Sequence, residues 1–191
     1  RAVEFANKYN VPVRVLSSFE PGSGTLISLE EKDMENGLVS GIAFQKDQMK
    51  YTLHGVSDTP GIAYSILGPL SDANIEVDVI VQNISVDGKT DFTFTVSKED
   101  EHATSEVIKQ MKNSLDFDDV IIDSQIAKVS LVGVGMRTHA GIASTAFKAL
   151  SENDVNIQMI STSEIKITIV INESAVTKAV KALHEAFELE K

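Results

Sequence analysis

An internal duplication is the feature of this sequence that most restricts its fold. The segments DTPGIA, at residues 58–63, and THAGIA, at residues 138–143, lie 80 residues apart, and each is followed by an apolar helix pattern and a strand pattern. A repeat of this length predicts two similar folding units. The positions that match at this offset are Gly61 and Gly141, Ile62 and Ile142, Ala63 and Ala143, Leu70 and Leu150, Ser71 and Ser151, and Ile80 and Ile160.

The composition is that of a globular chain with an acidic surface. Hydrophobic residues make up 42% of the 191 residues and charged residues 24%, which suffices for two cores in units of about 70 to 80 residues. The net charge of −11 disfavours nucleic acid and anionic membranes as partners. Since the sequence has no cysteine, disulfides and thiolate chemistry are excluded, which fits the cytoplasm. Because it starts at Arg1 without a signal-peptide pattern, we expect a piece of a longer chain.

Hydrophobic periodicity predicts the order βαββαβ for the first repeat. The predicted elements are a strand at residues 49–56, a helix at 60–73, strands at 75–81 and 92–96, a helix at 107–115 and a strand at 120–122. Such a unit buries its patterns as an antiparallel four-stranded sheet with both helices on one face. The predicted fold class is therefore α+β, with ferredoxin-like units.

The pattern of the second repeat lacks its last strand. Its predicted elements are a strand at residues 127–134, a helix at 141–153, strands at 155–160 and 165–171, and a helix at 175–187. Residues 11–16 alternate as a strand that has no repeat of its own, so we predict that they complete the second unit. The predicted domains are then residues 49–125, residues 126–191 with 1–18, and a connecting segment 19–48. In that segment, residues 45–48 are predicted to form a polar turn between two strands.

The start of the first helix is a candidate site for an amino acid. Pro60 near the first helical position leaves backbone N–H groups without partners, and such groups attract a carboxylate. Gly61 lets a ligand approach the backbone, and the amides of Ile62 and Ala63 are candidates to hold the carboxylate. Asp58 would then bind the ammonium group or, alternatively, cap the helix. An ordinary capped helix has the same sequence pattern.

Polar residues end the strand that follows each of these helices. They are Gln82 in the first repeat and Thr-Ser-Glu, at residues 162–164, in the second. A side chain there is placed to bind a hydroxyl or amine of a ligand, although a residue that satisfies its own turn has the same pattern. Glu76 and Asp78 flank Val77, so we expect both acids to point away from the core, toward solvent or a second subunit.

Catalytic and metal-binding patterns fail on spacing or on missing partners. The four histidines are scattered, and His139 has no serine or acid at a recognisable spacing. Gly-Val-Gly at residues 133–135 begins like a dinucleotide loop, but Thr138 takes the place of its third glycine. The adjacent acids at 30–31 and 118–119 point apart in regular structure. We predict no catalytic residue and no metal site in this sequence.

Four stretches together resemble the carboxy-terminal regulatory region of aspartate kinase. They are YNVPVRV at residues 9–15, the segment from TPG at 59–61 to DVIVQN at 78–83, VGVGMR at 132–137, and IQMISTSEIKI at 157–167. The resemblance covers nearly the whole sequence, and its last motif is specific. It implies two ACT units, the second completed by the amino-terminal helix and strand.

The resemblance also implies a function. In this family, threonine, lysine or both exert feedback control on phosphoryl transfer to aspartate. The catalytic domain lies upstream and carries the ATP, magnesium and aspartate sites, so no cofactor is expected in this sequence. It is expected to be a cytoplasmic sensor that forms a homodimer and acts on a catalytic subunit or domain, either as an excised tail or as a separate regulatory subunit.

By position, the resemblance assigns an effector site to both units. In the first unit it would use Asp58, Gly61, Ile62, Ala63, Glu76, Val77, Asp78 and Gln82, with Ser85 nearby. The residues that would face this site from the second unit are Ile142, Ala143, Asn156, Ile157, Ser163 and Glu164. Ala140 stands where the family commonly has proline, so the second helix start is expected to be less rigid.

Two other functions stay open on the sequence. One is an ACT-type sensor of a different amino-acid biosynthetic enzyme, although the motif at residues 161–167 argues against it. The other is a small acylphosphatase-like hydrolase, which would need an arginine and an asparagine beside a phosphate-binding loop. Arg137 is the only arginine near a helix start, and no asparagine accompanies it at a suitable position.

Overall fold

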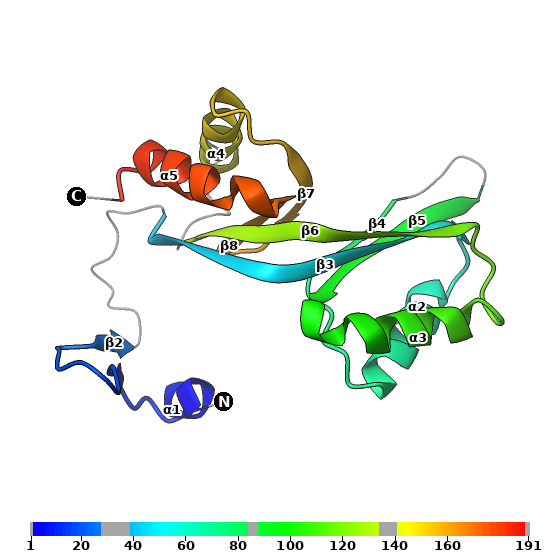
Figure 1. Cartoon of the computed structure of the whole chain (residues 1–191), viewed down its shortest axis with the longest axis horizontal. Coiled ribbons are helices and arrows are strands. Elements are labelled where there is room, and N and C mark those ends of the chain that lie inside the picture. Colours follow the sequence, from blue (N-terminus) through cyan, green and yellow to red (C-terminus); the bar gives the residue numbers. More distant parts are fainter. Residues whose placement is uncertain (1, 28–38, 84–87, 134–140, 190–191) are drawn as a thin grey trace. The chain divides into compact units, whose positions relative to one another are not determined.

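The computed structural model describes residues 2–27, 39–83, 88–133 and 141–189 (Figure 1). The chain divides into two compact units, residues 1–37 and residues 38–191. The smaller unit contains helix α1 (Ala2–Lys8) and the antiparallel strands β1 (Val13–Val15) and β2 (Thr25–Ile27). The larger unit contains both repeats.

The larger unit is built on one six-stranded antiparallel sheet in the order β4-β5-β3-β6-β8-β7. The strands are β3 (Gly41–Ser57), β4 (Ile80–Gln82), β5 (Lys89–Ser97), β6 (Asp119–Val132), β7 (Ile157–Thr162) and β8 (Lys166–Asn172). The helices are α2 (Ile62–Asp72), α3 (Glu101–Met111), α4 (Gly141–Glu152) and α5 (Val176–Ala186), with short 3₁₀ turns η1 (Lys98–Asp100) and η2 (Glu173–Ala175). Figure 1 shows α4 and α5 above the long strands at the left, and α2 and α3 below them at the right.

Each repeat has its own hydrophobic core between its helices and one face of its half of the sheet. In the first core, α2 and α3 cover Tyr51, Leu53 and Phe94, and the rings of Tyr51 and Phe94 stack with centroids 5.7 Å apart. Burial raises the pKa of the Tyr51 hydroxyl, which donates to the carbonyl of Glu101 at 3.3 Å. The second core packs α4 and α5 against the strands at Val129, among others. Two α+β units with antiparallel sheets and helices on one face were predicted, and this is confirmed.

The predicted turn at residues 45–48 is wrong. Strand β3 runs through these residues as one strand, and both of its halves pair with β6. The polar residues cause only an irregularity: the register shifts between Gln45 and Gln48, and Asp47 has a φ of 57°. The chain does not reverse here because β6 continues alongside and offers backbone partners on both sides of the irregularity.

The strand that completes the second repeat is also different from the predicted one. Residues 11–16 were predicted to complete the second unit, but the strand that does so is the amino-terminal half of β3, which lies beside β6 and pairs Gly41 with Val132 and Gln45 with Lys128. Residues Val13–Val15 pair with Thr25–Ile27 instead. The physical reason is that residues 39–45 carry an equivalent apolar pattern and lead directly into the long ladder with β6.

No helix in the described ranges is both long enough and apolar enough to span a bilayer.

Gly55, within β3, tests how strictly the ladder depends on backbone conformation. Its φ is +69°, its N–H donates to Asp91 Oδ1 at 3.1 Å, and an added Cβ would lie 2.0 Å from Asp118 Oδ2. We expect Gly55→Ala to lower the free energy of unfolding by about 1–2 kcal/mol, the cost of a left-handed conformation for an L-residue. Urea unfolding would measure this.

Gly41→Ala is the matched control for Gly55→Ala. Gly41 lies in the same strand, and nothing lies within 4 Å of an added Cβ. We expect its free energy of unfolding to change by less than about 0.5 kcal/mol. Equal losses in the two variants would contradict the assignment of strain to Gly55.

Candidate functional site

Residues 58–63, which we call the first mouth, form an open corner between the end of β3 and the start of α2. Gly61 is the N-cap residue of α2, with φ 94° and ψ −7°. Nothing lies within 4 Å of a Cβ added at Gly61, so the backbone is open to a ligand at this point. The first turn of α2 has no acidic side chain and Gly61 provides no side-chain cap. The positive end of the helix dipole is therefore left for another anion.

The backbone amides of the first mouth differ from the prediction in one respect. The N–H of Ile62 already donates to the carbonyl of Thr59 at 3.1 Å, so it is occupied in this conformation. The N–H of Ala63 lies in the first turn, where an α-helix offers no internal acceptor. The structure therefore leaves Ala63, rather than Ile62, as the amide that suits a carboxylate.

Asp58 and Gln82 meet at the first mouth, as residues of one site should. Gln82, at the end of β4, directs Nε2 toward Asp58 Oδ1 at 3.5 Å, which is long for a hydrogen bond. Both side chains are exposed. An acidic group and an amide thus face each other beside the helix start, with their hydrogen-bonding capacity largely unused by this contact.

The lysine on the strand next to Asp58 is engaged elsewhere. The N–H of Asp58 donates to the carbonyl of Gly88 at 2.8 Å, and Lys89 follows at the start of β5. The ammonium of Lys89 lies 2.7 Å from Asp118. This hydrogen bond raises the pKa of Lys89 and lowers the pKa of Asp118. Asp58 is therefore not the partner of this neighbouring cation.

Asp78, Val77 and Glu76 are not part of the first mouth. Asp78 lies four residues before Gln82 on the same extended segment, which corresponds to roughly 13 Å at the rise of a strand. Its carboxylate pairs with Lys128 of β6, which sequence analysis did not single out. Val77 packs against the first core, and Glu76 is exposed.

The predicted residues of the second repeat lie in separate places. Ile142 and Ala143 are in the first turn of α4, Asn156 and Ile157 lie where β7 begins, and Ser163 and Glu164 follow its end. Ile142 is buried in the first turn of α4, and Ala143 and Ile157 pack against the second core. Ser163 is engaged within the turn between β7 and β8, because its N–H and its hydroxyl both donate to the carbonyl of Lys166, at 2.7 and 3.3 Å. Figure 1 shows α4 above the long strands in the left half of the larger unit and α2 below them in the right half, and the start of β7 is level with Ala127 in the middle of β6. These residues therefore do not meet the first mouth, beyond the end of β3, within one chain.

The remaining two predicted residues of the second repeat are exposed. Asn156 is exposed just before β7, and Glu164 is exposed in the turn between β7 and β8. The predicted residue Ser85 and the positions Arg137, Thr138, His139 and Ala140 lie outside the described residues.

The described residues show no arrangement that suits catalysis. They contain no group of three histidine or acidic side chains that could hold a metal ion. His54 Nδ1 lies 2.6 Å from Asp91 Oδ1, a pair that the sequence did not predict, and both side chains are about half exposed. The geometry at the first mouth supports binding of a small molecule with a carboxylate and an ammonium.

Comparison with protein families matches both repeats to the ACT domain, at residues 52–116 and 129–187. Among curated proteins, the aspartate kinase of Pseudomonas fluorescens is 57% identical over 191 residues. That match covers 100% of this chain and 46% of the relative, so the chain spans about half the length of the curated relative.

Three solved structures show the same fold. One described as aspartokinase alpha and beta subunits is 48% identical, covers 79% of this chain and 99% of its own, and has a TM-score of 0.74. The ligand-free regulatory subunit of aspartate kinase from Thermus thermophilus is 32% identical, covers 78% and 99%, and has a TM-score of 0.75. Aspartate kinase from Synechocystis is 31% identical, covers 98% and 34%, and has a TM-score of 0.78.

Proposed function

We propose that this chain, which belongs to the aspartate kinase family and spans its regulatory ACT region, is the part of the enzyme that senses an amino acid. The catalytic domain lies in the part of the relatives that the chain does not match. The chain binds an amino acid at the first mouth and transmits its presence to the kinase as feedback inhibition. Membership of this family removes the support for an acylphosphatase-like hydrolase and for a sensor of an unrelated enzyme.

The observation that carries this proposal is the combination of groups at the first mouth. The uncapped start of α2, with the Ala63 amide in its first turn, suits a carboxylate. The exposed carboxylate of Asp58 suits an ammonium, and the amide of Gln82 beside it suits a polar side chain. These are the three recognition elements that an α-amino acid requires.

The effector we propose is threonine, lysine or both, the end products that regulate this family by resemblance. Gln82 offers a donor and an acceptor that suit the threonine hydroxyl. Isothermal calorimetry with threonine and lysine, singly and together, would identify the ligand. ATP and magnesium would bind only in the catalytic part, and we propose a cytoplasmic location for the whole enzyme.

Asp58→Ala tests the ammonium site. Removing the carboxylate leaves the ligand ammonium without its charged partner, so we expect affinity to fall by about 2 kcal/mol, roughly 30-fold. A thermal-shift titration with the effector would measure this. Asp72→Ala, at the exposed carboxyl end of α2, is the control and should leave affinity unchanged. Unchanged affinity in Asp58→Ala would refute the site.

Gln82→Ala tests whether the amide recognises the ligand side chain. If it bonds the hydroxyl of threonine, its loss should weaken threonine by about 1 kcal/mol and leave 2-aminobutyrate, which lacks the hydroxyl, almost unaffected. Each ligand serves as the control for the other in the same titration. Equal weakening of both ligands would mean that Gln82 only supports the shape of the first mouth.

We also propose that two copies pair through the edges of the sheet. Strands β4 and β7 end the strand order, and each carries a half-exposed isoleucine at the equivalent repeat position, Ile80 and Ile160. Exposed apolar edge strands tend to pair with another chain. Such a homodimer would also bring second-repeat residues such as Asn156 to a first mouth, which one chain alone does not do.

The smaller unit, residues 1–37, is proposed to dock on the catalytic part of the kinase. The Thermus thermophilus regulatory subunit matches 78% of this chain, about the share of residues 38–191, whereas the Synechocystis kinase matches 98%. Helix α1 buries none of its residues, and its apolar side lines a hollow with Ala2, Phe5, Ala6, Tyr9 and Val11. An exposed apolar face of this kind marks an interaction surface, and we propose that it packs against the catalytic part of the enzyme.

Phe5→Ala tests this docking. In a protein that joins this chain to a catalytic part, we expect the substitution to cost about 3 kcal/mol of stability, because a buried phenylalanine leaves a cavity. In the present chain, where Phe5 is 65% exposed, we expect a change below about 0.5 kcal/mol. Thermal unfolding of both forms would measure the difference. Tyr64→Ala, an exposed aromatic on α2, is the control and should be silent in both, and an equally silent Phe5→Ala would contradict the docking.

A further inference from the structure

We propose that Lys128 and Lys50 are positioning residues that each hold the segment following the first helix of the opposite repeat. Lys128, on the second repeat's strand β6, holds Asp78 of the first repeat, and Lys50, on the first repeat's strand β3, holds Gln158 of the second. Both contacts are observed in the structure. Only the expected effect of these lysines on effector binding rests on the proposed function.

The two lysines occupy the same position in the duplication. KYTLHG at residues 50–55 matches KVSLVG at residues 128–133 at an offset of 78 residues, two fewer than the 80-residue offset at which Asp78 matches Gln158. The structure supports this alignment, because the residues that follow at alternate positions face equivalent cores. Tyr51 and Leu53 lie in the first core, and Val129 and Leu131 in the second.

The contacts of the two lysines are reciprocal. Nζ of Lys128 donates to Oδ2 of Asp78, and Nζ of Lys50 donates to Oε1 of Gln158. In each case the lysine side chain extends from the first strand of its own repeat and contacts the segment that follows the first helix of the other repeat. This is the pattern expected when two repeats are related by an approximate two-fold axis.

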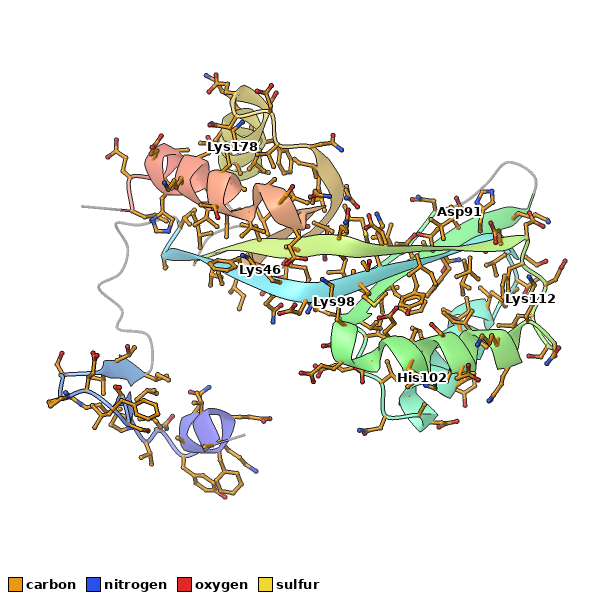
Figure 2. All side chains as sticks on the ribbon, in the orientation of Figure 1. Lys46, Asp91, Lys98, His102, Lys112 and Lys178 are labelled. Atoms are coloured by element: carbon orange, nitrogen blue, oxygen red, sulfur yellow. The ribbon has the colours of Figure 1, made fainter. Side chains whose placement is uncertain are left out.

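A third contact lies where such an axis would pass. Ser97 and Asn172 each cap a 3₁₀ turn through a side chain that accepts from the N–H two residues later, so η1 and η2 are equivalent. The next residues, Lys98 and Glu173, pair with each other at 2.9 Å. Figure 2 shows Lys98 near the middle of the larger unit. Equivalent residues of the two repeats thus meet directly.

Burial makes the contact of Lys128 the stronger constraint. Its side chain is 5% exposed, whereas the side chain of Asp78 is 45% exposed. A buried ammonium loses its hydration and requires a charged or polar partner in the protein. Lys50 is 18% exposed and has a second partner, Asp123 at 3.5 Å. Lys128 therefore depends on Asp78 more than Lys50 depends on Gln158.

The segment that Lys128 holds is also fixed from within its own repeat. The N–H of Asp78 donates to the carbonyl of Thr95, and the N–H of Val79 donates to the Thr95 hydroxyl, both at 3.1 Å. This segment continues directly into β4, whose last residue, Gln82, faces Asp58. Lys128 thereby positions the strand that brings Gln82 to the first mouth.

Hydrogen exchange resolved by peptide, on the full chain without effector, tests the cross-repeat contact. We expect Lys128→Met to increase exchange at least tenfold in residues 76–82 of the other repeat and to leave residues 155–162 unchanged. Lys50→Met should do the reverse, with a smaller increase. Lys128→Arg, which keeps the charge, should restore protection of residues 76–82. Increases confined to β6, or equal in both segments, would overturn the proposal.

Asp78→Asn provides a second test if Lys128→Met does not fold. It keeps an oxygen acceptor for the buried ammonium but removes the charge, so residues 76–82 should again exchange faster than in the original chain. Exchange at the original rate would overturn the proposal.

Threonine binding separates this inference from the proposed function. If the original chain binds threonine, Lys128→Met should weaken it about tenfold, and equal affinity would overturn the expected effect on effector binding. If the original chain binds neither threonine nor lysine, the proposed function fails, and the exchange result still decides whether Lys128 positions the opposite repeat.

Discussion

The antiparallel ladder between β3 and β6 is the interaction on which the larger unit depends. It runs from the pair Gly41 and Val132 to the pair His54 and Asp119, and so passes through both repeats. Each long strand serves one repeat with its first half and the other repeat with its second half. The two four-stranded sheets are therefore continuous with each other: β4, β5, the second half of β3 and the first half of β6 form one, and the first half of β3, the second half of β6, β8 and β7 form the other. The two cores are therefore joined through one shared backbone framework, and among the described residues they form two separate apolar clusters.

Much of this architecture could be predicted from local patterns. The spacing of Ile62, Ile66 and Leu70 predicts the buried face of α2, and all three side chains are buried there. The failures concern pairing over long distances. Polar residues at 45–48 indicate a turn locally, but the continuation of β6 beside them decides that the strand goes on. Residues 11–16 and 39–45 have similar alternation, so the sequence could not decide which of them pairs with β6.

The candidate site likewise contains residues that local patterns could predict and residues whose position depends on long-range pairing. Asp58, Gly61 and Gln82 could be grouped from the sequence because a strand end, a helix start and the next strand end meet at one edge of an α+β unit. Asp78 was placed with them by position in the family motif, yet its side chain goes to Lys128, 50 residues later. A lysine at the same place in both repeats was the available signal. It gains meaning only once the ladder brings each lysine to the opposite repeat.

The side-chain contacts between the two repeats, which we call the seam, differ chemically from the two cores, and this difference bears on how a regulatory chain works. The cores are aliphatic and aromatic, whereas these contacts are polar: Lys128 with Asp78, Lys50 with Gln158, and Lys98 with Glu173. An ion pair with one buried partner, such as Lys128 with Asp78, is a poor source of stability, since apolar residues of similar volume often stabilise as well as or better than a buried charge. What a directional pair does provide is one defined alignment of the segments it joins. Close-packed apolar cores resist small displacements, so any change in the alignment of the repeats would fall on these polar contacts rather than on the cores. A ligand that fixes β4 at the first mouth would then favour one alignment of the seam, and that alignment extends along β6 into the second repeat.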